Sequence, residues 1–159
     1  MGKVVLDSSV LVKSVLRPGR WLPSNIYRRE LETHRKARMV IRLLRDREYE
    51  VLLPYPVIVE TGAVISRLAG EKLAREIVES LKSTRDYTIV FEEEIREDAL
   101  EVAIRTGSSG FDAYIIALAW RRNAILVTDD EAMSMHASRI GARALLLRAV
   151  PEKELERII

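Results

Sequence analysis

Five acidic residues stand beside apolar segments in four separate parts of the chain: Asp7, Glu60, Asp112, Asp129 and Asp130. Carboxylate oxygens are the ligands that Mg²⁺ and Mn²⁺ prefer in proteins. Held by such a cluster, these ions promote hydrolysis, because they lower the pKa of a water molecule and stabilise charge on a phosphate. The chain has no cysteine and two histidines, which excludes a thiolate site and a three-histidine site within one chain.

Short apolar runs alternate with longer stretches of helical periodicity along the chain. The expected strands are 4–6, 51–53, 87–91, 124–127 and 144–147. The expected helices are 10–16, 24–47, 57–68, 71–81, 94–105, 111–122, 131–140 and 151–159. Continuous apolar strands that alternate with helices predict a parallel sheet with helices on both faces. We therefore expect a single α/β domain over residues 1–159.

This architecture would bring the acidic residues together at one edge. Open parallel sheets bind ligands at the carboxyl ends of their strands. Asp7 and the pair Asp129–Asp130 directly follow expected strands, whereas Glu60 and Asp112 lie in the first turns of expected helices. Because helices that follow strands start at the same edge, we expect acids from four remote segments to converge there.

Each acid also has an ordinary structural explanation when taken alone. An acid in a first helical turn complements the helix dipole, and one after a strand is a frequent turn or N-cap residue. Taken together, the acids are harder to explain in this way, because Asp7 and Glu60 follow apolar triplets and Asp112 lies at the start of the most apolar helix. Desolvated carboxylates that repel one another are costly unless a cation joins them.

Hydroxyl groups accompany the acids and are candidates for a supporting role. Ser8 and Ser9 follow Asp7, and Thr128 precedes Asp129. Such hydroxyls serve either as caps and turn formers or as groups that orient a ligand carboxylate. We take Ser9, Thr128 and Asp129 as supporting residues of the predicted site.

Four motifs occur in order over essentially the whole chain: Val-Leu-Asp7-Ser-Ser9-Val-Leu, Val-Glu60, Phe-Asp112-Ala-Tyr-Ile-Ile-Ala-Leu-Ala and Leu-Val-Thr128-Asp-Asp130. The set resembles the PIN-domain nucleases, most closely the VapC-type toxins. The resemblance implies a three-layer α/β/α sandwich around a five-stranded parallel sheet. It also implies bound Mg²⁺ or Mn²⁺ and cleavage of single-stranded RNA.

Matched residue by residue, the resemblance implies a quartet of catalytic, metal-binding acids: Asp7, Glu60, Asp112 and Asp130. The family's last motif reads Thr-x-Asp, which selects the second of the two adjacent acids and leaves Asp129 in the variable position. The family often has Asn two residues after its first Asp, where this chain has a serine.

The segment from Lys13 to Arg47 is strongly basic, with eleven basic and three acidic residues. It could contact several phosphates, and the candidate RNA-binding residues are Arg35, Lys36, Arg38 and Arg42. The alternative is a solvated helix with internal ion pairs, although three acids cannot neutralise eleven bases. An acidic antitoxin segment is another counterpart that would suit this surface.

The residues thus predict metal-dependent hydrolysis of phosphodiester bonds and do not distinguish RNA from DNA. The resemblance adds an endoribonuclease acting on single-stranded RNA, and the toxin of a toxin–antitoxin pair. Two alternatives stay open. One is a phosphatase with Asp7 as its nucleophile, although Ser9 stands where the haloacid-dehalogenase-like group has a second acid. The other is a non-catalytic module that binds RNA or a protein.

We also expect a homodimer, held by the basic helical segment and by the terminal residues Leu155, Ile158 and Ile159. No apolar run approaches the ~20 residues of a membrane span, and the N-terminus lacks a signal-peptide pattern. We therefore expect a cytoplasmic protein without a membrane partner. Glutamine is absent and asparagine occurs twice, which is a thermophile tendency that genomic base composition can also produce.

Overall fold

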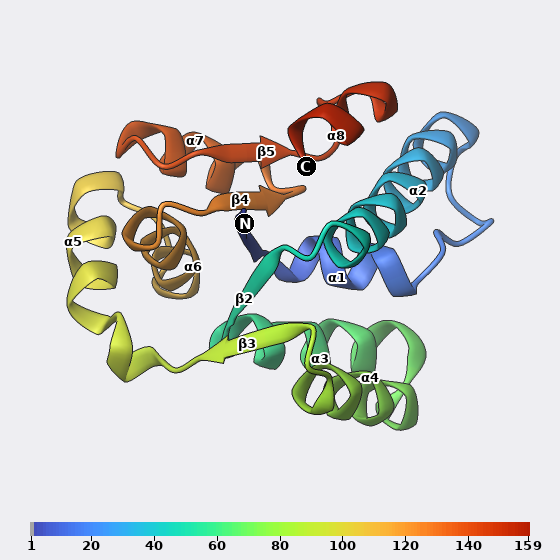
Figure 1. Ribbon diagram of the computed structural model, residues 1–159. Coiled ribbons are helices and arrows are strands. Elements are labelled where there is room, and N and C mark those ends of the chain that lie inside the picture. The colour runs from blue at the N-terminus through green and yellow to red at the C-terminus, as the bar shows by residue number, and fades with distance from the viewer. Residues whose placement is uncertain (1) are drawn as a thin grey trace.

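The computed structural model describes residues 2–159 and contains one five-stranded parallel sheet within them (Figure 1). The strands are β1 (Lys3–Leu6), β2 (Glu50–Pro54), β3 (Tyr87–Val90), β4 (Ile125–Thr128) and β5 (Ala144–Leu146). Their order in the sheet is β3-β2-β1-β4-β5, and every neighbouring pair is parallel. The central strand β1 pairs Val4 with Val51 on one side and with Ile125 on the other.

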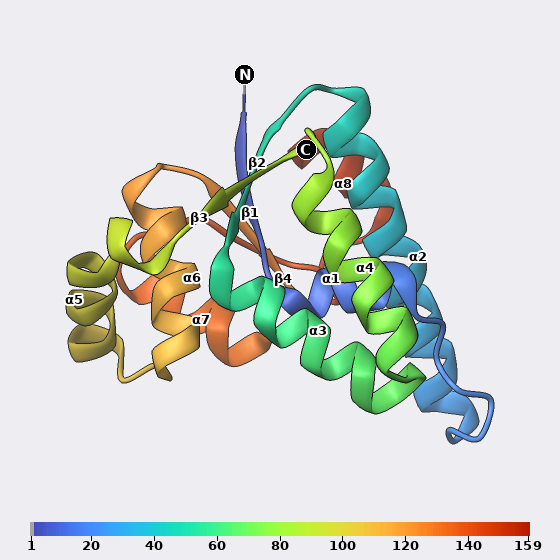
Figure 2. The same ribbon diagram turned by 90° about the horizontal axis from the view of Figure 1, so that it is seen from below.

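Helices connect the strands and cover both faces of the sheet. They are α1 (Ser8–Val15), α2 (Ser24–Asp46), α3 (Tyr55–Ala69), α4 (Glu71–Ser83), α5 (Arg96–Thr106), α6 (Gly110–Arg121), α7 (Glu131–Arg139) and α8 (Glu152–Ile158). A 3₁₀ turn, η1 (Glu92–Glu94), precedes α5. In Figures 1 and 2, α5, α6 and α7 lie on one side of the sheet, and α2, α4 and α8 lie on the other. The expected three-layer α/β/α fold is confirmed.

The core lies on both faces of the sheet, as the continuous apolar runs predict. Val4, Val5 and Leu6 of β1 are fully buried, and so are Leu126 and Val127 of β4. The helix α6 is buried from Ile115 to Ala119 and packs on β1, β2 and β4. The strands and α6 thus share one close-packed core.

Helix α1 begins earlier than its apolar pattern predicts. Asp7 is its N-cap, and the Asp7 carboxylate accepts a hydrogen bond from the backbone N–H of Ser9 at 3.4 Å. A capping acid satisfies an N–H group that has no partner inside the helix, so the helix starts at Ser8. The end of α5 matches its expected position, because Gly107 stops this helix in the left-handed region, at φ 70°.

The C-terminal helix does not supply the dimer surface expected from the sequence. Leu155 is fully buried and Ile159 is 3% exposed, and both pack into the core of their own chain. Only Ile158, at 40% exposed, faces outward among the three terminal residues. The prediction that these terminal residues form a dimer surface was wrong, because an amphipathic helix turns its apolar side toward the core of its own chain. Here α8 packs against α2.

Among the helices of residues 2–159, none combines the length and the apolar character needed to cross a membrane.

Candidate active site

The four acids predicted to form a quartet follow strands of the sheet or lie in helices on its carboxyl side. Asp7 follows β1 and caps α1, and Asp130 follows β4 and caps α7. Asp112 lies in the first turn of α6. Glu60 lies in the second turn of α3, one turn later than expected, because the helix already begins at Tyr55.

Two pKa shifts show that the four carboxylates act on one another. Burial raises the pKa of Glu60, and the carboxylates of Asp7, Asp112 and Asp130 raise it further, against a hydrogen bond from Ser8 that lowers it. Burial also raises the pKa of Asp112, and the carboxylates of Asp130 and Asp7 add to the rise, against a hydrogen bond with Ser109 and the charge of His136, which lower it. Both shifts have the same meaning: the folded chain disfavours negative charge on these groups. The charges of acids from four remote segments thus bear on Glu60 and Asp112.

Hydroxyl groups hold the Asp7 carboxylate, which is 2% exposed. Its Oδ2 atom accepts hydrogen bonds from Ser9 Oγ at 2.5 Å and from Thr128 Oγ1 at 2.9 Å, and Ser8 Oγ lies 3.4 Å from Oδ1. Thr128 Oγ1 in turn accepts from the backbone N–H of Asp130 at 3.0 Å. The hydroxyls of Ser9 and Thr128 thus fix one acid of the quartet and connect it to the segment that carries another.

Asp129 and Asp130 are adjacent in the chain but have different surroundings. Asp129 is 2% exposed, and its carboxylate forms ion pairs with Lys13 and with Arg148, the latter at 3.0 Å. Burial alone would raise the pKa of Asp129, but hydrogen bonds from Arg148 and Lys13 outweigh it and hold this pKa below its usual value. Asp130 is exposed, and its carboxylate raises the pKa of Glu60. The two acids thus differ: Asp129 is buried in ion pairs, whereas Asp130 is exposed and acts on Glu60.

We call the ion pairs of Asp129 with Lys13 and Arg148 the Asp129 brace. It joins α1, the end of β4 and the segment after β5, and Lys13 also pairs with Glu30 of α2 at 2.8 Å. Ser9 Oγ accepts a hydrogen bond from the Asp129 backbone N–H at 2.9 Å, which links the brace to Asp7. Sequence reasoning missed Lys13 and Arg148 as partners of Asp129, because no local pattern pairs Lys13 with a residue more than a hundred positions away.

The quartet fits a divalent cation by the chemistry of its donors. Within residues 2–159, no Lys or Arg side chain forms an ion pair with Asp7, Glu60, Asp112 or Asp130. His136 lowers the pKa of Asp112, but burial and the other carboxylates outweigh it. As the side chains stand, no three Asp, Glu or His groups of the described residues are arranged to enclose an ion. The donor set is nevertheless all oxygen and anionic, which suits Mg²⁺ or Mn²⁺.

The four basic residues that were predicted to bind RNA differ in their exposure to water. Arg35, Arg38 and Arg42 are exposed on α2. Lys36 is 3% exposed, its ammonium pairs with Glu32 at 2.9 Å, and it also donates to the carbonyl of Arg148 at 3.5 Å. Lys36 is therefore not available to an RNA phosphate, because helical periodicity turns it toward the segment after β5 while its neighbours face water.

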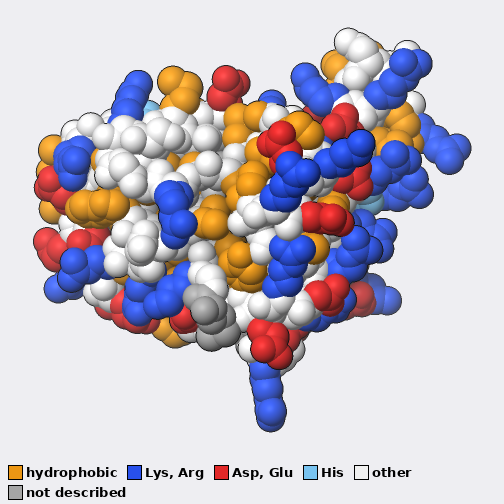
Figure 3. All heavy atoms as spheres, turned by 45° about the horizontal axis from the view of Figure 1, so that its top comes forward, with side chains coloured by type: hydrophobic (Ala, Val, Ile, Leu, Met, Phe, Trp, Pro, Cys, Tyr) orange, Lys and Arg blue, Asp and Glu red, His pale blue; other side chains and the backbone are white. Residues whose placement is uncertain are grey.

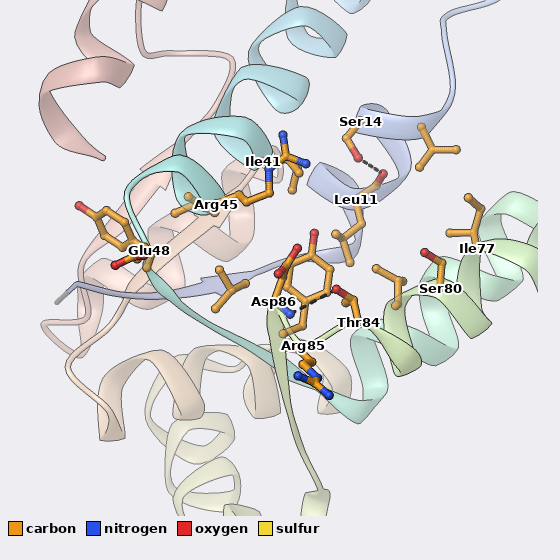
Figure 4. Close-up of a pocket in the computed structure, with 16 residues that line it drawn as sticks. Leu11, Ser14, Ile41, Arg45, Glu48, Ile77, Ser80, Thr84, Arg85 and Asp86 are labelled. Carbon is orange, nitrogen blue, oxygen red and sulfur yellow. Dashed lines mark hydrogen bonds between the residues drawn. The ribbon is translucent and has the colours of Figure 1, made fainter.

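A cavity of about 760 Å³ lies away from the quartet, between α1, α2, α4 and β3 (Figure 4). Leu11, Ile41 and Ile77 supply part of its apolar wall, and Arg45 and Asp86 stand at its polar side. No residue of the quartet lines it.

The model of the PIN domain family matches residues 24–138, which is more than half of the chain. The protein belongs to the PIN-domain family. The resemblance predicted from the four motifs is confirmed at this level. The match includes Glu60, Asp112 and Asp130 of the PIN domain and begins after Asp7. No protein of curated function matches the chain in sequence.

Several solved structures share the fold of this PIN domain. VapC20 of Mycobacterium tuberculosis, described as a toxin that cleaves the sarcin-ricin loop, aligns with TM-score 0.65 and 17% identity over 87% of this chain and 95% of its own. FitAcB of Neisseria gonorrhoeae aligns with TM-score 0.61 and 14% identity over 92% and 99%. VapBC2 of Rickettsia felis, bound to a promoter DNA fragment, aligns with TM-score 0.61 and 15% identity over 90% and 97%. At these identities the likeness is one of fold.

Proposed function

We propose that this PIN domain is a metal-dependent endoribonuclease that hydrolyses phosphodiester bonds of single-stranded RNA. One observation carries the proposal: burial and carboxylates from other segments raise the pKa of Glu60 and of Asp112, and no Lys or Arg of residues 2–159 forms an ion pair with the quartet. Membership in the PIN family and the likeness of fold to VapC20, a toxin that cleaves the sarcin-ricin loop, support it.

In this proposal the quartet Asp7, Glu60, Asp112 and Asp130 holds Mg²⁺ or Mn²⁺. When bound, the ion supplies Lewis acidity: it favours deprotonation of a water molecule and stabilises negative charge on the scissile phosphate. The chain supplies orientation. The hydroxyls of Ser9 and Thr128 hold the Asp7 carboxylate, and the Asp129 brace holds the backbone that carries Asp130. Serine and cysteine nucleophiles have no role in this reaction.

Adding Mn²⁺ is expected to raise the melting temperature of the purified protein by about 5 °C or more at ~100 times the dissociation constant, because the ion binds only the folded state. Glu60→Gln should remove most of this shift, whereas Glu76→Gln, an exposed acid on α4, should keep it. EDTA should reverse the shift. An equal shift in both variants would place the ion elsewhere.

The reaction itself is tested with three substrates in the presence of Mn²⁺: a mixed-sequence single-stranded RNA, the single-stranded DNA of the same sequence, and para-nitrophenyl phosphate. We expect internal cleavage of the RNA and its loss with EDTA. Hydrolysis of para-nitrophenyl phosphate alone would favour the phosphatase alternative. Binding of RNA without cleavage would favour a non-catalytic module.

We further propose an antitoxin partner for the protein in its cell. The fold is shared with VapC20 of Mycobacterium tuberculosis, which is described as a toxin, and with VapBC2 of Rickettsia felis, which is bound to a DNA fragment from its promoter. A small open reading frame directly upstream of the gene is the corresponding genomic observation.

The protein is also proposed to form a homodimer, through a face that differs from the one expected from the sequence. Large apolar side chains exposed on α3, α5 and α6 include Val59, Leu100, Ile104 and Phe111. Val59 and Phe111 are chain neighbours of Glu60 and Asp112, so a second copy on this face would border the quartet. Large apolar side chains exposed to water are candidates for an interaction surface, and pairing of two identical copies is the commonest form of oligomer.

Light scattering should give about twice the 18.2 kDa mass of the chain at micromolar concentration. Ile104→Glu should shift the protein to monomer, because it places a charge in the apolar face. Trp21→Glu, at a side chain 87% exposed in the loop between α1 and α2, is the matched control and should leave the dimer intact. A wild-type mass near 18.2 kDa would contradict the dimer.

A further inference from the structure

A second cavity, of about 720 Å³, lies on the outer side of α2. It is bounded by the last turn of α1, by one face of α2 and by the start of α8. Five arginines line it: Arg17, Arg35, Arg38, Arg42 and Arg45. Glu152 is the one acidic residue in its lining. We call this cavity the arginine pocket, and none of its residues belongs to the quartet or to the Asp129 brace.

The positive charge of the arginine pocket is not neutralised by the chain. Within residues 2–159, the guanidinium groups of Arg17, Arg35, Arg38 and Arg42 have no carboxylate within ion-pair distance. Arg45 pairs only with its neighbour Asp46, at 3.8 Å, and both side chains are exposed. Figure 3 shows Lys and Arg side chains gathered over the α2 side of the molecule. Such a surface attracts an anionic partner.

The arginines form a regular row. Arg35, Arg38, Arg42 and Arg45 follow one another at intervals of three or four residues, so they share one face of α2 and repeat about every 5 Å along its axis. Each guanidinium offers a planar fork of donors that can hold two phosphate oxygens at once. A row of this kind fits a chain with regularly repeated negative charges better than a single small anion.

We propose that the arginine pocket binds the phosphodiester backbone of the RNA strand outside the cleavage site. The proposal rests on the proposed function for the identity of the strand. Helix α1 connects the two places: Ser8 follows Asp7 of the quartet, and Ser14 lines the pocket. Six residues of helix span about 9 Å, so one strand can reach both with a few nucleotides between them.

The test is the binding of a 20-nucleotide mixed-sequence RNA by the full chain without divalent metal. Arg35→Gln, Arg38→Gln and Arg42→Gln together should weaken binding at least about tenfold at low salt. They should also reduce the slope of log affinity against log salt by about 2, the value for three lost phosphate contacts on a single strand. With Mn²⁺, the KM for cleavage of this RNA should rise in parallel.

A matched control removes the same charge elsewhere. Lys72→Gln, Lys82→Gln and Arg143→Gln lie on α4 and before β5, and all three side chains are exposed. The control should bind RNA with the salt slope of the wild type, and far-ultraviolet circular dichroism should show both variants folded.

An unchanged salt slope in the arginine variant would overturn the proposal, and so would an equal loss in the control. Retained RNA binding with lost binding of poly-glutamate would assign the pocket to an acidic protein segment and also overturn it. If the wild type cleaves no RNA but the arginine variant loses RNA binding and the control does not, the nuclease fails and the pocket stands. Normal cleavage with unchanged binding in the variant would instead support the nuclease and overturn the role of the pocket.

Discussion

Asp7→Asn, Glu60→Gln and Asp112→Asn are each expected to abolish RNA cleavage, with losses of roughly a thousandfold, the scale for removing a group that stabilises transition-state charge. Each substitution keeps the shape of the side chain and removes its negative charge. In the proposed function this lowers the affinity of the site for the divalent cation, because the remaining three carboxylates carry less negative charge. The effect should appear in kcat at saturating Mn²⁺.

The same substitutions should differ in their effect on stability. Because burial and neighbouring carboxylates raise the pKa of Glu60 and of Asp112, ionisation of either group costs the folded state free energy. Glu60→Gln and Asp112→Asn should therefore raise the metal-free melting temperature at pH 7. Asp7→Asn should not raise it, because the Asp7 carboxylate already accepts hydrogen bonds from Ser9 and Thr128.

The pH dependence follows from the same two shifts. A raised pKa in the folded state contributes stability below the ordinary values of 4.5 for Glu60 and 3.8 for Asp112. That contribution is lost as the pH rises through the raised values. Metal-free melts from pH 4 to pH 8 should show this loss in the wild type and a smaller one in Glu60→Gln.

Cleavage of mixed-sequence RNA with Mn²⁺, alongside these melts, measures both effects. Glu76→Gln is the matched control, since this acid is exposed on α4 and outside the quartet, and it should behave as the wild type. Full activity in any one of the three site variants would remove that residue from the quartet. A lower metal-free melting temperature for Glu60→Gln would show that its charge is already balanced.

Asp129→Asn and Asp130→Asn are expected to separate stability from activity. Asp129→Asn should destabilise the fold, because it leaves Lys13 and Arg148 beside a neutral group. We expect a cost of about 2 kcal/mol, less than the roughly 3–5 kcal/mol for a fully buried pair, since those two side chains remain 23% and 39% exposed. Asp130→Asn should leave the melting temperature within a few degrees, because Asn also serves as an N-cap of α7.

In the RNA cleavage assay, Asp130→Asn should be the more damaging of the two substitutions. Asp130→Asn should lower kcat about tenfold or more, because it removes one charge from the quartet. Asp129→Asn, assayed well below its melting temperature, should keep more activity than Asp130→Asn. Urea melts and cleavage rates are measured on the same preparations. If Asp129→Asn proved the more damaging to kcat while still folded, the Thr-x-Asp register would select the wrong acid.

The Asp129 brace has an expected pH response of its own. The lowered pKa of Asp129 means that the brace contributes stability above the ordinary value of 3.8 and loses it as the pH falls through the lower folded value. This direction is opposite to that of Glu60, so the two groups can be distinguished in one set of melts.

Much of the fold follows from the sequence, because the forces that determine it are local. Val4–Leu6 and Leu126–Val127 are continuous apolar runs, and such strands are stable only when both faces are covered, which leads to a parallel sheet. In a parallel sheet all carboxyl ends lie at one edge, so the convergence of Asp7 and Asp130 with the other acids was predictable from their positions. The ends of helices were less predictable, because the Asp7 N-cap lets α1 begin at Ser8, before its apolar pattern starts.

The tertiary structure alone decided the roles of adjacent or similar residues. Asp129 and Asp130 are identical in type, and only tertiary packing brings Lys13 and Arg148 to the first of them. Lys36 belongs to the same basic run as Arg35, yet it is buried where it meets the carbonyl of Arg148, 112 positions away. Leu155 likewise covers the core of its own chain. Charge, burial and partner at these positions are set by segments that are remote in the chain, and local sequence patterns carry no information about such contacts.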